Sequence, residues 1–218
     1  MSKQLFSRLS ILILLAAAVA ACKTATGGTS AGNPILQPGA PGQDTRTITT
    51  AQATDLSKVG ATAADIKFMQ GMIGHHAQAV EMVALIADRS ANPDMKKLGL
   101  RIQISQDDEM NMMRKYLADR GAAIPGPHAH HEPGGFMPGM LTQEEMTELA
   151  NAKGVAFDRL FLMGMIKHHG GAITMVEDLF KTPGAAQEGG IFAFASDVDA
   201  DQRMEIDRMG AMLKEIMK

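Results

Sequence analysis

The chain has 218 residues and a net charge of −3, and its 21 basic and 24 acidic residues form no long run of either sign. This excludes nucleic acid as the main partner, because phosphate binding needs a clustered basic surface. Aromatic residues make up 4% of the chain and methionine reaches 18. A core filled by methionine and aliphatic side chains favours helices over β-sandwiches or barrels.

The N-terminus has the features of an export signal. Lys3 and Arg8 precede an apolar run over residues 9–21 that is too short for a comfortable membrane span. The run ends in Val-Ala-Ala-Cys at Cys22, which resembles the lipobox of bacterial lipoproteins. We therefore expect residues 1–21 to be a signal peptide and Cys22 to carry a lipid. The mature protein would face the periplasm, with the outer membrane favoured in a Gram-negative cell. The alternative is an ordinary signal peptide that ends near a cysteine.

The stretch that follows is rich in glycine, proline and threonine and has little to bury, which predicts a flexible tether over residues 22–48. Cys22 is the single cysteine of the chain. An acylated protein would have no free thiol and no internal disulfide. A soft metal ion would therefore bind methionine thioethers and histidine imidazoles.

Residues 49–218 are predicted to form one all-α domain. Thr62 and Asp65 make a capping pair at the start of the first long helix. Asn92 and Pro93 suit the N-cap and first position of the second. The expected helices cover residues 62–89, 93–119, a short stretch that opens at Thr142, 155–181 and 191–217, and the proline- and glycine-rich connector covers residues 121–141.

Two segments of the chain repeat one another. FMQGMIGHHAQAVEM begins at Phe68 and FLMGMIKHHGGAITM at Phe161, and eight of the fifteen paired positions are identical. The helices that follow also match, because a Gln-x-x-Glu-x-x-x-Met pattern begins at both Gln106 and Gln202. The repeated unit is a helical hairpin, and two hairpins predict an antiparallel four-helix bundle.

Heptad spacing places one histidine of each pair in an apolar seam. His75 and His168 are expected inside the seam, while His76 and His169 lie about 100° round the helix, at its edge. The seam positions are Phe68, Met72, His75, Ala79, Met82 and Ile86 in the first copy and Phe161, Met165, His168, Ala172, Met175 and Leu179 in the second.

The partner helices place polar residues in the same seam, at Gln106 and Glu109 and again at Gln202 and Glu205. An unpaired buried polar group costs about 1–3 kcal/mol. We therefore expect the two seam histidines to bind the two glutamates near a pseudo-twofold axis, with the glutamines completing the network.

Two interpretations of this cluster stay open. A His–Glu network could fix the register of the helices without any ligand. Alternatively it binds metal, which the duplication favours, because a polar cluster is kept twice where leucine would be simpler. Each nearby methionine taken singly is core filler, but methionine and histidine without cysteine form the ligand set expected for copper. These methionines are Met72 and Met82 around His75, and Met165 and Met175 around His168.

The connector adds a second group of candidate ligands. His128, His130 and His131 are followed by Met137 and Met140. Short histidine-rich tracts are typical of metal-binding segments, although they do not discriminate among copper, zinc and nickel. A merely polar loop is the alternative.

The whole pattern resembles the domain-of-unknown-function 305 family over about residues 50–217. The resemblance implies an exported, ferritin-like four-helix bundle, with some members similar to periplasmic copper-binding proteins of the CopM type. In one departure, Gly74 and Gln78 of the first copy replace Lys167 and Gly171 of the second, so the two half-sites need not bind equally. The resemblance is carried by D-x-x-F-x-x-x-M-I-x-H-H-x-x-A-x-x-M from Asp65, MPGM from Met137, FD-x-x-F from Phe157, HHGGAI-x-M from His168 and the closings at Gln106 and Gln202.

The leading hypothesis is a lipid-anchored extracytoplasmic protein that binds copper, as Cu(I) or Cu(II), or another divalent transition metal. It would buffer copper for homeostasis or resistance without catalysis, with copper-handling proteins as partners. The alternatives are an envelope structural or interaction module and a di-metal carboxylate oxidase, which is disfavoured because Met72 and Met165 stand where a Glu-x-x-His motif needs glutamate. The predicted metal ligands are His75, His76, His168, His169, Met72, Met82, Met165, Met175, Glu109, Glu205, His128, His130, His131, Met137 and Met140.

Overall fold

A computed structural model describes residues 34–37, 44–55, 59–126 and 136–218. They fall into two compact units, Met1–Asp55 and Leu56–Lys218. Within the described ranges, no helix combines the length and apolarity that a membrane span requires. The predicted signal peptide, the lipid attachment site Cys22 and the connector histidines His128, His130 and His131 lie outside the described residues.

The first unit holds a short hairpin. Strand β1 (Ile35–Gln37) pairs antiparallel with β2 (Arg46–Ile48), and helix α1 (Thr50–Thr54) follows. The Arg46 Nε–H donates to Gln37 Oε1 across the hairpin at 2.7 Å. These strands were not predicted from the sequence, because three residues are too few for a visible alternation of polar and apolar side chains.

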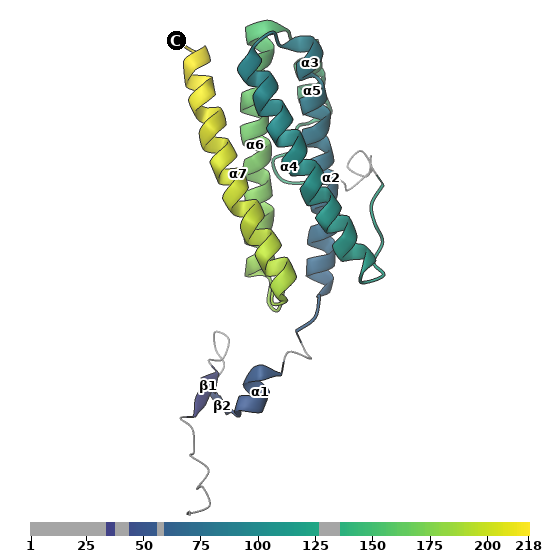
Figure 1. The fold of residues 1–218 in the computed structure, drawn as a ribbon, viewed down its shortest axis with the longest axis vertical. Coiled ribbons are helices and arrows are strands. Elements are labelled where there is room, and N and C mark those ends of the chain that lie inside the picture. The colour runs from purple at the N-terminus through teal and green to yellow at the C-terminus, as the bar shows by residue number, and fades with distance from the viewer. Residues whose placement is uncertain (1–33, 38–43, 56–58, 127–135) are drawn as a thin grey trace, which may run out of the picture. The chain divides into compact units, whose positions relative to one another are not determined.

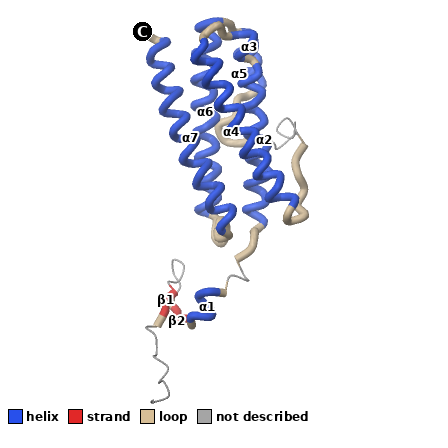
Figure 2. The backbone as a smooth tube through the Cα atoms, in the orientation of Figure 1, coloured by secondary structure: helices blue, strands red, loops and turns tan. Residues whose placement is uncertain are grey.

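The second unit is mostly helical, as predicted (Figures 1 and 2). Four of its helices are long. Among them α2 packs against α4, α6 packs against α7, and contacts between α2 and α6 join the two pairs. The helices are α2 (Ala63–Ala84), α3 (Ile86–Arg89), α4 (Pro93–Ala118), α5 (Gln143–Asn151), α6 (Gly154–Lys181) and α7 (Gly189–Ile216).

The helix starts follow the local chemistry of the sequence. The Thr62 hydroxyl accepts the Asp65 N–H at 3.2 Å, and Asp65 Oδ2 accepts the Thr62 N–H at 2.7 Å, which confirms the capping pair. Asn92 caps α4 as predicted. The helix expected over residues 62–89 is interrupted at Leu85, whose N–H donates to Met82 O, three residues back, at 3.2 Å. This tighter turn separates α2 from α3.

Buried apolar side chains form two clusters. One combines the first halves of α2 and α7 with the second halves of α4 and α6, and includes Phe68 and Phe194. The other uses the opposite ends of these helices and includes Phe157 and Phe161. Along each long helix, buried polar residues stand between the two clusters in sequence. We call this set the polar layer, and it comprises His75, His76, Gln106, Glu109, His168, His169, Gln202 and Glu205.

A five-residue segment of the connector, which we call the strap (137–141), lies against α2 and α6. It contains a tight turn in which the Met140 N–H donates to Met137 O at 3.2 Å. Pro138 suits the second position of such a turn, and Gly139, with φ of 76°, suits the third, where a positive φ favours glycine. The MPGM sequence thus forms a turn that presents the Pro138 carbonyl to the helices.

The strap is held by residues at corresponding positions of the two repeats. On α2, the Gln78 amide donates to Leu141 O at 2.9 Å and accepts the Leu141 N–H at 2.8 Å. On α6, the absent side chain of Gly171 leaves room for the strap, because a Cβ there would lie 1.9 Å from Pro138 O. The one strap contacts both α2 and α6, but in different ways. This explains why the position that is Gln78 in the first repeat is Gly171 in the second.

Replacing Gly171 by alanine is expected to lower the free energy of unfolding by about 1–3 kcal/mol, because backbone of the strap has to move away from α6. Urea unfolding monitored by circular dichroism measures the change. The matched control is Gly170→Ala in the same helix, where a Cβ meets nothing within 4 Å. The control should be neutral or stabilising by up to about 1 kcal/mol. Equal stability of the two variants would contradict the strap contact.

Candidate functional site

The glutamates of the polar layer bind the second histidine of each pair. His76 Nε2 lies 2.6 Å from Glu109 Oε2 and joins α2 to α4. His169 Nε2 lies 2.5 Å from Glu205 Oε2 and joins α6 to α7. The prediction that the seam histidines bind these glutamates was therefore wrong. His76 and His169 are also fully buried instead of lying at the edge of the helix. Because α2 contacts both α4 and α6, its buried arc is wide enough for two successive side chains.

The seam histidines meet each other instead. The ring centroids of His75 and His168 are 3.8 Å apart, with 40° between the ring planes. The His75 Nε2–H donates to Pro138 O in the strap at 2.9 Å, and the His168 Nε2–H donates to the backbone oxygen of His75 at 2.9 Å. A carbonyl oxygen can only accept, so the proton of each neutral ring is on Nε2 and its Nδ1 carries a lone pair.

Burial keeps the two seam imidazoles neutral. Burial, assisted by the neighbouring His76 and opposed by the hydrogen bond to Pro138, lowers the pKa of His75 from 6.5 to about 3. Burial, followed by the proximity of His75, also holds the pKa of His168 well below 6.5. The lone pair on Nδ1 of each ring thus stays free of protons in neutral and mildly acidic solution.

Glu109 is ionised although it is buried. Burial alone would raise the pKa of this carboxyl group, but the hydrogen bonds from His76 and Ser105 outweigh burial and lower it. The Ser105 hydroxyl donates to Glu109 Oε1 at 3.0 Å, so both carboxylate oxygens are bound. The carboxylate is therefore fixed in one orientation behind the His76 ring.

The four imidazoles share one further property. In each of them Nε2 is bound to an oxygen, whereas Nδ1 is buried and has no hydrogen-bond partner among the described residues. The side chains of Gln106 and Gln202 also keep buried polar atoms unpaired. An unsatisfied buried group costs about 1–3 kcal/mol. So many in one layer call for an explanation, such as a bound ion or ordered water.

The two repeats present their histidine pairs with nearly identical geometry. The rings of His75 and His76 have centroids 6.3 Å apart and planes inclined by 57°, and the rings of His168 and His169 have values of 6.2 Å and 56°. Among the described residues, no group of three or more His, Cys, Asp or Glu side chains is arranged to hold a metal ion. The layer presents the same arrangement of two imidazoles once in each repeat.

The predicted methionine ligands occupy different surroundings. Met72 is fully buried in one apolar cluster, and Met82 and Met165 are fully buried in the other. Met140 is a buried residue of the strap itself, and its sulfur accepts the Met137 N–H at 3.2 Å. Met137 and Met175 are partly buried and line a groove beside the polar layer.

Asp201, which lies on α7 near the polar layer, was not among the residues predicted from the sequence. Burial raises the pKa of its carboxyl group, and the nearby carboxylates of Glu109, Glu205 and Asp197 raise it further. Asp201 precedes Glu205 by four residues, as Ser105 precedes Glu109 in the other repeat. The four-residue spacing, which puts two side chains on one helix face, was the signal that could have found it.

Comparison with known proteins identifies the family. The model of the domain of unknown function DUF305 matches residues 65–213. The chain belongs to the DUF305 family. The structure of a DUF305 fragment from Deinococcus radiodurans is 30% identical, with a TM-score of 0.63 over 71% of this chain and 98% of that one. For a DUF305 protein from Streptomyces coelicolor the values are 28%, 0.61, 70% and 93%.

Two further relatives match this DUF305 protein over different lengths of chain. CopM in its Cu(II)-bound form is 25% identical, with a TM-score of 0.56 over 69% of this chain and 96% of that one. The uncharacterized protein L153 of Acanthamoeba polyphaga mimivirus is 39% identical over 56 residues. That match covers 26% of this chain and 37% of the length of the viral protein.

The lowered pKa of His75 predicts how stability depends on pH in the absence of metal. Between the unfolded value of 6.5 and the folded value of about 3, the unfolded chain binds more protons, so stability falls as the pH falls below 6.5. Each buried neutral histidine should contribute a slope of about 1.4 kcal/mol per pH unit. Urea unfolding with chelator between pH 6.5 and 5 measures it. His75→Gln should reduce this slope by the contribution of one histidine. An unchanged slope would contradict the lowered pKa of His75.

Proposed function

We propose that this DUF305 protein binds copper, chiefly as Cu(I), through the histidines of the polar layer, and buffers copper outside the cytoplasm. The observation that carries the proposal is the state of the four imidazoles. Each has Nε2 bound to an oxygen and a buried Nδ1 that finds no partner in the described part of the chain.

This arrangement has the form of a prepared metal ligand. Histidines that bind metals commonly donate the N–H of the other ring nitrogen to a carboxylate or a backbone carbonyl, which fixes the tautomer and the ring orientation. Here Glu109 and Glu205 supply the carboxylates for His76 and His169. The carbonyl oxygens of Pro138 and His75 play the same part for the seam histidines. The free nitrogen of every ring is then Nδ1.

The number and kind of donors favour a monovalent ion. Cu(I) and Ag(I) accept two ligands in a linear arrangement, whereas Zn²⁺ usually takes four. The polar layer offers imidazoles in pairs, and no larger group of His, Cys, Asp or Glu is gathered among the described residues. Because the pKa of His75 is lowered to about 3, protons compete weakly for its lone pair. Copper, when bound, would be coordinated by the free Nδ1 atoms, and its positive charge would compensate the nearby carboxylates. The protein orients these nitrogens and keeps water away from them.

Relatives of known ligand content support the choice of metal. CopM was solved with Cu(II) bound, and after soaking with silver, at 25% identity to this chain in both cases. Silver ions carry one positive charge and prefer soft ligands, as Cu(I) does. The similarity extends over most of CopM, at 96% of its chain, so the comparison concerns the whole helical unit.

We take the four long helices as a ferritin-like antiparallel bundle of two duplicated hairpins. The leader sequence supports export and Cys22 supports a lipid anchor facing the periplasm. The Streptomyces coelicolor relative is described as a presumed secreted protein, which agrees with export. A binding role without catalysis, with copper-handling proteins as partners, completes the proposal.

Replacing Glu109 and Glu205 by glutamine tests the role of the polar layer. Glutamine keeps an acceptor oxygen but no charge, so the hydrogen bonds that orient the His76 and His169 rings weaken and Cu(I) affinity should fall by about 10–100-fold. Anaerobic titration against a chromogenic Cu(I) chelator measures the affinity. Glu177→Gln is the control, because Glu177 is exposed and pairs with Lys181 at the surface. Unchanged affinity in the double variant, or no Cu(I) binding by the wild-type chain, would leave the polar layer with a purely structural role.

A further inference from the structure

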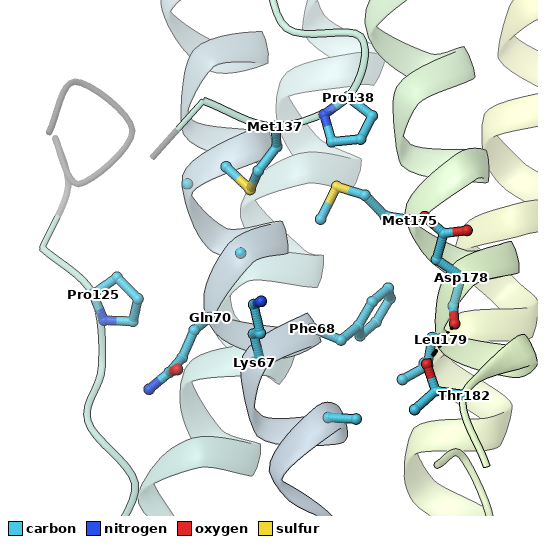
Figure 3. Close-up of a pocket in the computed structure, with 13 residues that line it drawn as sticks. Lys67, Phe68, Gln70, Pro125, Met137, Pro138, Met175, Asp178, Leu179 and Thr182 are labelled. Carbon is cyan, nitrogen blue, oxygen red and sulfur yellow. Dashed lines mark hydrogen bonds between the residues drawn. The ribbon is translucent and has the colours of Figure 1, made fainter. Parts of the chain in front are cut away.

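A groove beside the polar layer is lined by two methionine side chains that come from different parts of the chain (Figure 3). It has a volume of about 540 Å³ and is open to solvent on one side. Met137 reaches into it from the strap and Met175 from α6, and the Phe68 ring lies below them. The floor beneath the two methionines is the surface of α2 at Gly71 and Gly74.

The two thioether groups meet above Gly71. A Cβ placed at Gly71 would lie 3.1 Å from Met137 Sδ and 3.4 Å from Met175 Cε. Both thioethers are therefore in contact with the same point, and Figure 3 shows their side chains directed toward each other from opposite sides of the groove. Because residue 71 has no side chain, both thioether groups can approach the surface of α2 closely.

The backbone on each side of this pair is fixed while the side chains stay adjustable. Met137 is the first residue of the strap, whose turn is closed by the Met140 N–H and anchored by the His75 bond to Pro138 O. Met175 lies one helical turn beyond Gly171, the contact point of the strap on α6. Methionine has three rotatable side-chain bonds, so two thioethers on rigid supports can close around one ion.

Solvent access separates this pair from the methionines of the core. A methionine is most often core filler, and that explanation suits Met72, Met82 and Met165, which are fully buried in the apolar clusters. Met137 and Met175 are partly buried and border an open groove, so their sulfur atoms can be reached from solvent.

We propose that Met137 and Met175 form a second metal site, selective for a soft monovalent ion such as Cu(I) or Ag(I) and separate from the histidines of the polar layer. Thioether sulfur is neutral and soft, and binds Cu(I) in preference to Cu(II) or Zn²⁺. Among the described residues that line the groove there is no histidine, and the charged ones, Lys67 and Asp178, carry opposite signs. A hard divalent ion would find few suitable ligands there.

The position of the pair suggests its use as an entry site. The strap residue Pro138, next to Met137, is bound by the seam histidine His75, so the thioether pair lies one residue along the chain from a contact of the polar layer. An ion held weakly by sulfur in the groove could pass to the buried imidazoles. This part of the inference rests on the proposed function, whereas the thioether site itself does not.

The experiment titrates Ag(I) into the full chain and follows the methyl resonances of ¹³C-labelled methionine by NMR, together with the stoichiometry of bound silver. Ag(I) is the probe because it is stable in air. In the wild-type chain the Met137 and Met175 methyl signals should shift together and saturate at the same silver concentration. The Met137→Leu/Met175→Leu variant should bind one silver ion fewer per chain, and leucine preserves the apolar volume of both sites.

The matched control is Met163→Leu/Met204→Leu, because these side chains are 51% and 63% exposed and lie outside the groove. This variant should bind silver as the wild-type chain does. If the Met137→Leu/Met175→Leu variant keeps the full stoichiometry, or if the wild-type Met137 and Met175 signals do not respond to silver, the thioether site is overturned.

The Glu109→Gln/Glu205→Gln variant separates this inference from the proposed function. If it binds silver less tightly in the polar layer while the Met137 and Met175 signals still saturate as in the wild-type chain, both sites are supported as independent. If the Met137→Leu/Met175→Leu variant loses a silver ion but the Glu109→Gln/Glu205→Gln variant binds silver as the wild-type chain does, the thioether site stands. The proposed function of the polar layer then fails.

Discussion

The hydrogen bond from each imidazole Nε2 to an oxygen is the interaction on which the centre of this protein depends. Four aromatic rings with polar edges are buried between two apolar clusters, and each ring is oriented by one strong acceptor. Two of these acceptors are the carboxylates of Glu109 and Glu205, which tie α2 to α4 and α6 to α7. The same bonds that hold the helices together also decide which nitrogen of each ring is left free.

The strap shows how a duplicated fold can carry a single connection. The two helical repeats are closely alike at their histidines, yet one segment of five residues has to lie across both. The contact is made by an amide at Gln78 and by a missing side chain at Gly171. The Pro138 carbonyl then serves His75 alone, while His168 donates to the backbone of α2. The difference between the half-sites thus arises from the connection and not from the histidines themselves.

Local chemistry made much of the fold predictable from the sequence. Capping at Thr62 and Asn92 located helix starts, and the heptad pattern correctly buried His75 and His168. The same pattern misplaced His76, because a heptad describes packing against one neighbour while α2 has two. The contact between Pro138 and His75 spans 63 residues and leaves no periodic trace, so only a three-dimensional arrangement could reveal it.

The apolar clusters on either side of the polar layer have a consequence for any ion that reaches it. An apolar cluster that includes Phe68 and Phe194 lies on one side of the layer, and a cluster that includes Phe157 and Phe161 lies on the other. An ion entering this interior gives up its water shell, and the energy required grows with the square of its charge. A singly charged ion therefore crosses this barrier far more readily than a doubly charged one. The apolar surroundings of the layer thus discriminate between the oxidation states of a metal ion through its charge.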